Sequence, residues 1–176
     1  MSPMRKPTSL DKIQLLLLDV DGVLTRGDLS YADSGEQIKT FNSKDGLGLR
    51  LLMDAGIKVG IVTGRLAGAL LHRCQNLGID LIFDGVKKKG EAVERISETT
   101  GIALENMAFM GDDLIDLPAM VRVGLSIAVL DASTDVQKHA DIICKNPGGR
   151  GAVREVCEDI LKAKNLWEEI LESYLQ

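Results

Sequence analysis

Residues Leu15–Thr25 (LLLLDVDGVLT) constrain the fold of this 176-residue chain more than any other stretch. The apolar run from Ile13 to Leu18 has no polar alternation, which is typical of a strand buried on both faces of a parallel sheet. The run ends in Asp19 and Asp21, and open parallel sheets bind ligands beyond the carboxyl ends of their strands. Two unpaired carboxylates are costly to bury, which favours a bound cation or a chemical role. Taken alone, however, the pair is better explained by an Asx-turn and a helix cap.

Composition limits the class of protein. A hydrophobic content of 45% in 176 residues is enough for one domain with a sizeable core. The net charge of -5, with acids and bases interspersed, argues against a nucleic-acid binder. We expect no membrane association, because the chain has neither an apolar run of membrane-spanning length nor a signal-peptide pattern. Cys74, Cys144 and Cys157 have unrelated spacings, which indicates buried reduced thiols and a cytoplasmic protein.

Apolar segments alternate with helical patterns, as in an α/β protein with a doubly wound, mainly parallel sheet and right-handed crossovers. Strands are expected at residues 13–18, 57–62, 79–83, 107–110, 125–129 and 141–143. Helices are expected at residues 47–55, 66–77, 89–100, 117–123 and 133–139, and from residue 152 onward. Leu29–Tyr31 and Gln37–Phe41, on either side of a turn with Gly35, predict a β-hairpin inserted after the first strand.

Polar side chains follow three of these strands, and a lysine opens one of the helices. These residues are Asp19, Asp21, Thr63, Lys89, Asp112 and Asp113. Because the carboxyl ends of parallel strands share one edge of the sheet, we expect these side chains to converge. Converging carboxylates repel one another unless a divalent cation lies among them, and oxygen ligands favour Mg²⁺ over Zn²⁺.

A cation, a lysine and a hydroxyl group around a carboxylate suit phosphoryl transfer. Lys89 would neutralise the phosphoryl oxygens, and Thr63 would donate a hydrogen bond to one of them. A carboxylate can attack phosphorus to form an aspartyl-phosphate. A second acid two residues away can protonate the leaving oxygen and then deprotonate the incoming water. The two acids of the first strand would therefore have different roles.

The pattern resembles the four motifs of the haloacid dehalogenase superfamily of phosphatases. The matching segments are DVDGVLT, VTGR, Lys89 within KKKGEAV, and GDDLIDLP. The resemblance implies that Asp19 is the nucleophile and that Asp21 is the general acid/base, with its backbone carbonyl also reaching the metal. It implies that Thr63 and Lys89 hold the phosphoryl group. Lys89 is chosen over its two lysine neighbours by its spacing from Gly85 and its place at the helix start, and those neighbours are most simply a solvated run.

The same resemblance implies the ligands of a Mg²⁺ ion. They would come from Asp19, Asp21, Asp112 and Asp113. Asp112 is the expected third contact of the ion. Asp113 would bind the ion through water or accept a hydrogen bond from one of its ligands. Asp116 is a candidate for orienting the other groups, although an N-cap with Pro118 in the first helical turn explains it equally well.

Over nearly the whole chain, to about Lys162, the sequence is similar to the capless 3-deoxy-D-manno-octulosonate 8-phosphate phosphatase family. The similarity rests on DVDGVLT, FNSKDGLG, TGR, GDDLIDLP and GGRGAVREVC. It implies a phosphorylated sugar acid of lipopolysaccharide synthesis as substrate. It also implies a homotetramer formed through the hairpins, in which neighbouring subunits help to close each site and residues 148–151 approach an active site. The expected substrate-binding residues are Thr63, Gly64, Arg65, Lys89 and Arg150, the two arginines because a guanidinium binds carboxylate or phosphate through two hydrogen bonds.

This interpretation divides the chain into a flexible tail at residues 1–10, a phosphatase domain at 11–163 and a C-terminal helical tail at 164–176. Three alternatives stay open. The substrate could be a related nine-carbon keto-sugar acid phosphate, or the chain could be a non-catalytic binding module of similar fold. Response-regulator receiver domains also gather acids, a threonine and a lysine at a sheet edge, but their motifs come in another order and GDDLIDLP has no counterpart there.

Overall fold

The structure, a computed structural model, describes residues 7–65 and 67–176 and is built around one parallel sheet. Its strands are β1 (Leu15–Leu18), β4 (Lys58–Val62), β5 (Leu81–Phe83), β6 (Met107–Gly111), β7 (Leu125–Ala128) and β8 (Ile142–Ile143). They lie in the order β5-β4-β1-β6-β7-β8, and each neighbouring pair is parallel. The predicted doubly wound α/β fold is confirmed.

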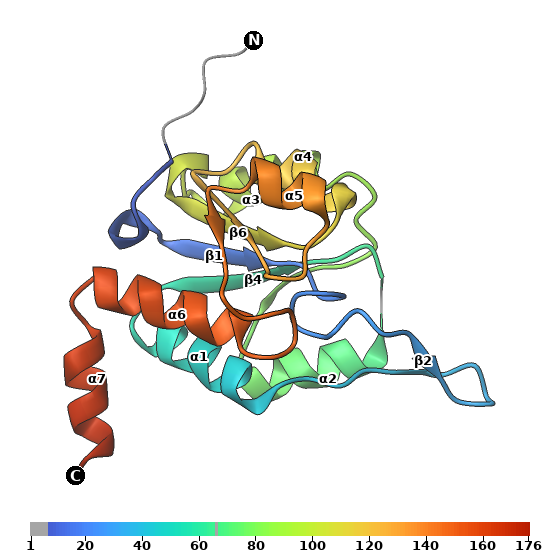
Figure 1. The fold of residues 1–176 in the computed structure, drawn as a ribbon, viewed down its shortest axis with the longest axis horizontal. Coiled ribbons are helices and arrows are strands. Elements are labelled where there is room, and N and C mark those ends of the chain that lie inside the picture. Colours follow the sequence, from blue (N-terminus) through green and yellow to red (C-terminus); the bar gives the residue numbers. More distant parts are fainter. Residues whose placement is uncertain (1–6, 66) are drawn as a thin grey trace.

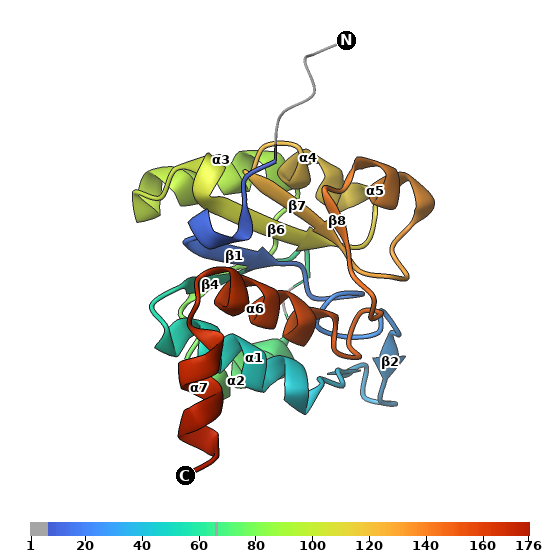
Figure 2. The same cartoon turned by 60° about the vertical axis from the view of Figure 1, so that its left-hand side comes forward.

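Helices cover both faces of the sheet. They are α1 (Ser43–Asp54), α2 (Gly68–Leu77), α3 (Lys89–Thr100), α4 (Leu117–Met120), α5 (Thr134–His139), α6 (Ala152–Ala163) and α7 (Trp167–Tyr174). One face carries α3, α4 and α5, and the other carries α1, α2 and α6 (Figures 1 and 2). The continuous apolar character of β1 follows from this arrangement, because all four of its residues are fully buried between the two helical layers.

The central position of β1 determines where the acids of the first motif lie. Leu18 is level with Ile61 of β4 and with Met110 of β6, so the three strands end at one edge. The Asp19 amide extends this register by donating a hydrogen bond to the Met110 carbonyl at 3.1 Å. The residue after β1 is therefore held by the sheet ladder itself.

The predicted hairpin follows β1 and forms a small separate sheet. Its strands, β2 (Ser30–Tyr31) and β3 (Gln37–Ile38), are antiparallel and shorter than predicted. They project from the body of the domain and expose Tyr31 and Ile38 (Figure 1). Between β1 and α1 the described chain holds this hairpin and no inserted domain, in agreement with the capless arrangement.

Helix α1 begins at Ser43, four residues earlier than its predicted start at Leu47. Asn42 is the N-cap, and its side chain accepts hydrogen bonds from the amides of Lys44 and Asp45. Gly46 and Gly48 therefore lie inside the helix rather than before it. A Cβ at Gly46 would lie 2.1 Å from Arg73, and one at Gly48 would lie 3.0 Å from Arg154, so both glycines permit close packing on neighbouring helices.

The two ends of the chain differ in their attachment. Residues 1–6 of the predicted N-terminal tail lie outside the described residues, and so does Leu66 of the predicted second helix. The described end of that tail is bound to the domain, because the Thr8 amide donates a hydrogen bond to the Gly124 carbonyl. At the C-terminus the predicted helical region is two helices, and Asn165, at φ 59°, lies in the turn between α6 and α7.

Two further expectations can be compared with the structure. Each helix within residues 7–65 and 67–176 is too short or too polar to cross a membrane. Cys74, Cys144 and Cys157 are buried free thiols, as predicted. Burial raises the pKa of the Cys74 thiol to about 11 and that of Cys144 to about 12, so neither is a reactive thiolate at neutral pH.

Candidate active site

The carboxyl ends of β1, β4 and β6 open into a depression of about 370 Å³. It is lined by Asp19, Asp21, Gly27, Leu29, Thr63, Gly64, Arg65, Asp112, Asp113 and Ile115. Seven of the nine predicted site residues are in this group. Lys89 lies beneath the depression, and Arg150 is exposed and is not among its described lining residues. The predicted convergence at this edge of the sheet is confirmed for the strand-end residues.

Lys89, at the start of α3, links two carboxylates in the floor of the site. Its side chain is only 2% exposed, and its Nζ lies 2.7 Å from Asp19 Oδ1 and 2.6 Å from Asp116 Oδ1. Burial alone would lower the pKa of Lys89, but the two carboxylates outweigh it and raise the pKa above its usual value. The ammonium group therefore stays charged beside Asp19.

Asp116 is a residue whose role the sequence left open between orienting other groups and capping a helix. It is fully buried, and its side chain makes no capping bond to α4. Its Oδ2 instead accepts hydrogen bonds from the amides of Asp112 at 3.0 Å and Asp113 at 3.3 Å, while Oδ1 binds Lys89. Gly111 makes room for it, because a Cβ there would lie 2.5 Å from the Cβ of Asp116. Asp116 thus fixes both the lysine and the GDD turn.

The pKa of Asp112 indicates that negative charge exceeds positive charge at this site. Burial, followed by the nearby Asp116, Asp19 and Asp113 carboxylates, raises the pKa of Asp112 to about 8. Burial and Asp116 also raise the pKa of Asp19, to about 6, against the opposing effect of Lys89. One lysine therefore does not neutralise this group of acids.

The acids fit a divalent cation. Asp19, Asp112 and Asp116 each offer a carboxylate oxygen, and these oxygens lie within 4.8 Å of one another. The oxygens of Asp116 are already bound to Lys89 and to two amides, so Asp19 and Asp112 are the better donors. Hard oxygen donors with excess negative charge match Mg²⁺, as predicted.

Two predicted ligands have side chains outside this cluster. The exposed Asp113 accepts a hydrogen bond from the Leu114 amide at 2.7 Å and serves as N-cap of the 3-10 turn Leu114–Asp116. The carboxylate of Asp21 forms an ion pair with Lys39. The roles of the Asp21 backbone carbonyl as a metal ligand and of Asp113 as a ligand through water remain predictions, and Asp116 takes the place of Asp113 among the clustered acids.

Lys39 is a residue near the site that sequence reasoning missed. It follows β3 in the hairpin, and its side chain is 3% exposed although the hairpin strands are largely open to solvent. Its Nζ contacts Asp21 Oδ1, across 18 positions in the chain. The predicted insertion of the hairpin directly after the first strand is the available signal, but nothing in the pattern distinguishes this lysine from other cations.

The substrate-side residues occupy different environments. Thr63 is 2% exposed, and its Oγ1 accepts a hydrogen bond from the Arg65 amide at 3.3 Å. Arg65 is exposed at the rim of the depression. The turn that carries Arg150 packs on the loop after Asp21, where the Gly149 amide donates a hydrogen bond to the Val23 carbonyl at 2.8 Å. The predicted approach of residues 148–151 thus occurs as backbone packing against the loop of the same chain.

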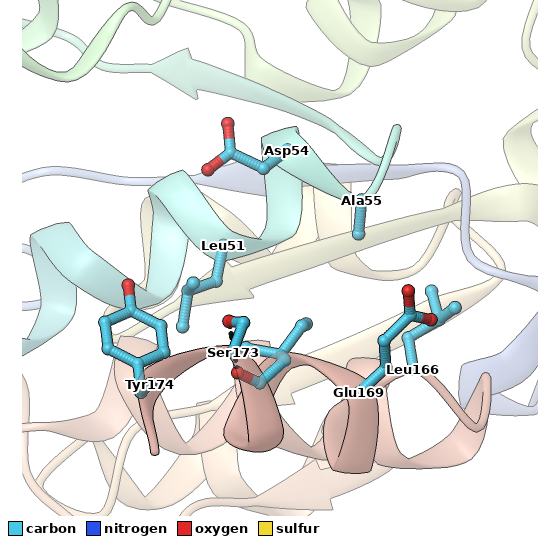
Figure 3. Close-up of a pocket in the computed structure, with 8 residues that line it drawn as sticks. Leu51, Asp54, Ala55, Leu166, Glu169, Ser173 and Tyr174 are labelled. Atoms are coloured by element: carbon cyan, nitrogen blue, oxygen red, sulfur yellow. Dashed lines mark hydrogen bonds between the residues drawn. The ribbon is translucent and has the colours of Figure 1, made fainter. Parts of the chain in front are cut away.

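A larger depression, of about 420 Å³, lies between α1 and α7 (Figure 3). Its described lining is Leu51, Asp54, Ala55, Leu166, Glu169, Ile170, Ser173 and Tyr174. The Ser173 hydroxyl donates a hydrogen bond to the Ile170 carbonyl of its own helix. The ionisable side chains here include two acids and no described lysine or arginine, so this surface would repel a phosphate ester rather than bind it.

Known proteins resemble this chain along most of its length. It is 45% identical over 159 residues to the 3-deoxy-D-manno-octulosonate 8-phosphate phosphatase of Escherichia coli K12, covering 90% of this chain and 85% of the relative. The solved phosphatase of the same name from Yersinia pestis has a TM-score of 0.89 at 43% identity, covering 90% of this chain and 86% of that one. The Moraxella catarrhalis phosphatase, solved with a magnesium ion, a phosphate ion and a KDO molecule, has a TM-score of 0.92 at 38% identity, covering 94% and 95%.

The fold and the strand-end acids define a haloacid dehalogenase-like hydrolase, and residues 79–155 match the model of that class. The identity to the curated relatives is spread over nine-tenths of the chain. The chain belongs to the family of 3-deoxy-D-manno-octulosonate 8-phosphate phosphatases, as its motifs predict.

Proposed function

We propose that this chain is a Mg²⁺-dependent phosphomonoesterase that hydrolyses 3-deoxy-D-manno-octulosonate 8-phosphate to the free sugar acid and phosphate. The observation that carries the proposal is the buried Lys89, which holds Asp19 at the carboxyl edge of the sheet. Family membership supports the phosphatase activity, and the Moraxella catarrhalis relative with magnesium, phosphate and KDO supports the metal and the class of substrate.

In the first step, a carboxylate oxygen of Asp19 attacks phosphorus. The bond between phosphorus and the sugar oxygen breaks, and the Asp21 carboxyl group gives its proton to that oxygen. Lys89 fixes Asp19 through Oδ1, so that attack starts from one orientation of the carboxylate. The product of this step is an aspartyl-phosphate together with the free sugar acid.

In the second step, water attacks the same phosphorus atom. Asp21, now ionised, takes a proton from the water, and the bond between phosphorus and the Asp19 oxygen breaks to release phosphate. Thr63 and the ammonium of Lys89 are the groups of this chain that would bind the phosphoryl oxygens through both steps. A magnesium ion held by Asp19 and Asp112 would supply further positive charge to these oxygens.

Arg65 and Arg150 are the proposed partners for the carboxylate of the sugar acid, with Gly64 lining the same depression. Arg65 is the better placed of the two, because it lies at the rim of the depression. The guanidinium group pairs with a carboxylate through two hydrogen bonds, which simple sugar phosphates cannot offer in addition to their phosphate.

We also propose a homotetramer assembled through the hairpins and located in the cytoplasm. The exposed Leu29, Tyr31 and Ile38 on the hairpin are apolar groups suited to burial against another subunit. The three free thiols fit a reducing compartment. Sedimentation of the purified chain tests the assembly, and a monomer would refute it.

A phosphate-release panel tests the substrate. It compares the octulosonate 8-phosphate, a nine-carbon keto-sugar acid phosphate and simple sugar phosphates, with Mg²⁺ and with a chelator. We expect the octulosonate ester to have the highest kcat/KM, and equal low rates on all esters would refute the specific assignment. Asp19→Asn should abolish turnover of every ester while the chain stays folded, and retained activity would exclude the covalent route.

A further inference from the structure

The two acids of DVDG are held by two lysines from different parts of the molecule. Lys89, in the first turn of α3, binds Asp19 from within the sheet domain. Lys39, which follows β3, binds Asp21 from the hairpin. Both lysine side chains are almost fully buried, at 2% and 3% exposed.

The arm of the hairpin that carries Lys39 is fastened to the domain a few residues further on. Arg73 of α2 donates a hydrogen bond to the Asn42 carbonyl at 3.1 Å, and its guanidinium lies 5.8 Å from the centre of the Phe41 ring. The Asn42 side chain also caps α1. The backbone at Asn42, three residues after Lys39, is therefore attached to two helices of the domain, although the strands β2 and β3 are largely open to solvent.

Lys39 lies behind Asp21 as seen from the depression. Asp21 is among the lining residues, whereas the described lining does not include Lys39. Lys39 also contacts one particular oxygen, Oδ1, so the other oxygen of Asp21 is the one for proton exchange with a substrate. A phosphate ester in the depression would meet Asp21 and Arg65 before it could reach the buried ammonium of Lys39.

We infer that Lys39 is a positioning residue for proton transfer by Asp21, an inference that rests on the proposed function. The Lys39 ammonium donates a hydrogen bond to Oδ1 of Asp21, whether that carboxyl group is protonated, as in the first step, or ionised, as in the second. This contact stops rotation of the carboxyl group and directs Oδ2 toward the leaving oxygen in the first step and toward water in the second. Misplacement of a proton donor by a fraction of an ångström is costly, because catalysis depends on near-attack geometry. The hairpin thereby takes part in catalysis within its own subunit.

A positioning role for Lys39 predicts a dependence on the leaving group that a purely structural role does not. A sugar alkoxide is a poor leaving group and needs a proton as it departs, whereas p-nitrophenolate departs readily without one. Loss of Lys39 should therefore slow the first turnover of a sugar phosphate much more than the first turnover of p-nitrophenyl phosphate. It should change KM little, because Lys39 does not line the depression.

The test compares Lys39→Met, Lys39→Arg and the control Lys58→Met in the full-length, Mg²⁺-loaded enzyme. Lys58 is an exposed lysine at the opposite, amino end of β4. For Lys39→Met we expect the first-turnover rate on the sugar phosphate to fall by about 10- to 100-fold. We expect the nitrophenolate burst to slow by less than about threefold, with a low steady rate afterwards because Asp21 must still activate water. Lys39→Arg should recover part of the loss, and Lys58→Met should match the wild type.

A second measurement does not depend on activity. Hydrogen–deuterium exchange of residues 36–42 in the metal-free protein should accelerate in Lys39→Met and stay unchanged in Lys58→Met, with melting temperatures reporting that both are folded. Equal loss on both esters, a rise in KM alone, or kinetics like those of Lys58→Met would overturn the positioning role. If Lys39→Met does not fold, Lys39→Gln takes its place. Full activity on the sugar phosphate together with unchanged hydrogen–deuterium exchange in Lys39→Gln would equally overturn the positioning role. A wild-type chain that cleaves no phosphate ester would instead overturn the proposed function, and this inference with it.

Discussion

Gly22 and Asp112 lie so close that a side chain on the first would occupy the position of the second. A Cβ on Gly22 would lie 2.0 Å from Asp112 Oδ2, and Gly22 has a φ of +93°, in the region that favours glycine. The glycine of DVDG is therefore required by the acid of GDD, more than 80 positions later in the chain. Two motifs that look independent in the sequence are one packing unit at the site.

Gly22→Ala should destabilise the fold and displace Asp112. We expect a loss of about 3 kcal/mol in the free energy of unfolding, from backbone strain and the clash together. Mg²⁺ affinity and kcat should each fall at least about tenfold, because a metal donor has moved. Urea unfolding, Mg²⁺ titration and phosphate release check these values. Gly35→Ala is the matched control, since Gly35 has a φ of +82° but no neighbour within 4 Å, and it should cost only about 1 kcal/mol and keep activity.

Asp116→Asn tests whether Asp116 orients Lys89 and the GDD turn. The substitution removes one of the two carboxylates that bind Lys89, and it leaves too few acceptors for Lys89 and the amides of Asp112 and Asp113 together. We expect a loss of about 3 kcal/mol in stability and of about 100-fold in kcat, because a buried ion pair is broken beside Asp19, the proposed nucleophile. Asp113→Asn changes an exposed neighbour and should cost less than about 1 kcal/mol. Similar effects of the two substitutions in urea unfolding would contradict the central role of Asp116.

The metal-free protein should lose stability as the pH rises toward 8. The folded-state pKa values of Asp19 and Asp112, about 6 and about 8, are raised above the value of 3.8 for a free aspartate. The folded chain therefore binds protons more tightly than the unfolded chain, and this contribution is complete below pH 3.8 and lost as the pH passes 6 and then 8. Added Mg²⁺ binds the ionised acids, so it should raise the melting temperature more at pH 8 than at about pH 5. A melting temperature of the metal-free protein that is constant over this pH range would contradict the raised pKa values. Asp112→Asn should flatten the dependence of the melting temperature on pH.

The sheet and the strand-end residues could be predicted because both follow from local patterns and one topological rule. Continuous apolar runs such as residues 15–18 identify buried strands, and parallel strands bring their carboxyl ends to one edge whatever the helices do. Asp19, Thr63 and Asp112 therefore converge without any knowledge of side-chain contacts. The start of α1 at Ser43 could not be predicted from local pattern alone. Gly46 and Gly48 are unfavourable inside a helix, and the close packing of neighbouring helices that explains them is visible only in the structure.

The residues that the sequence left unassigned act through non-local contacts. Asp116 looked like a helix cap because the 3-10 turn Leu114–Asp116, which rotates its side chain under the GDD turn, has no distinct sequence signal. The role of Lys39 depends on the contact of the chain after β3 with Asp21, and a hairpin sequence predicts its strands but not which residue of the domain the chain contacts afterwards. Arg150 is predicted to lie beside the substrate, yet the described contacts of its turn with the loop after Asp21 are made by the backbone.

Asp45 connects that turn to the domain and supplies a final prediction. It is 1% exposed within α1, and its carboxylate accepts hydrogen bonds from the amides of Arg154 at 2.9 Å and Gly151 at 3.3 Å, at the start of α6. Asp45→Ala should lower the free energy of unfolding in urea by about 2 kcal/mol, because two amides at the partly buried start of α6 lose their acceptor. It should also lower kcat a few-fold, since the turn at residues 147–151 packs on the loop after Asp21. Asp54→Ala, an exposed change in the same helix, is the control, and an Asp45→Ala variant no less stable than this control would refute the connection.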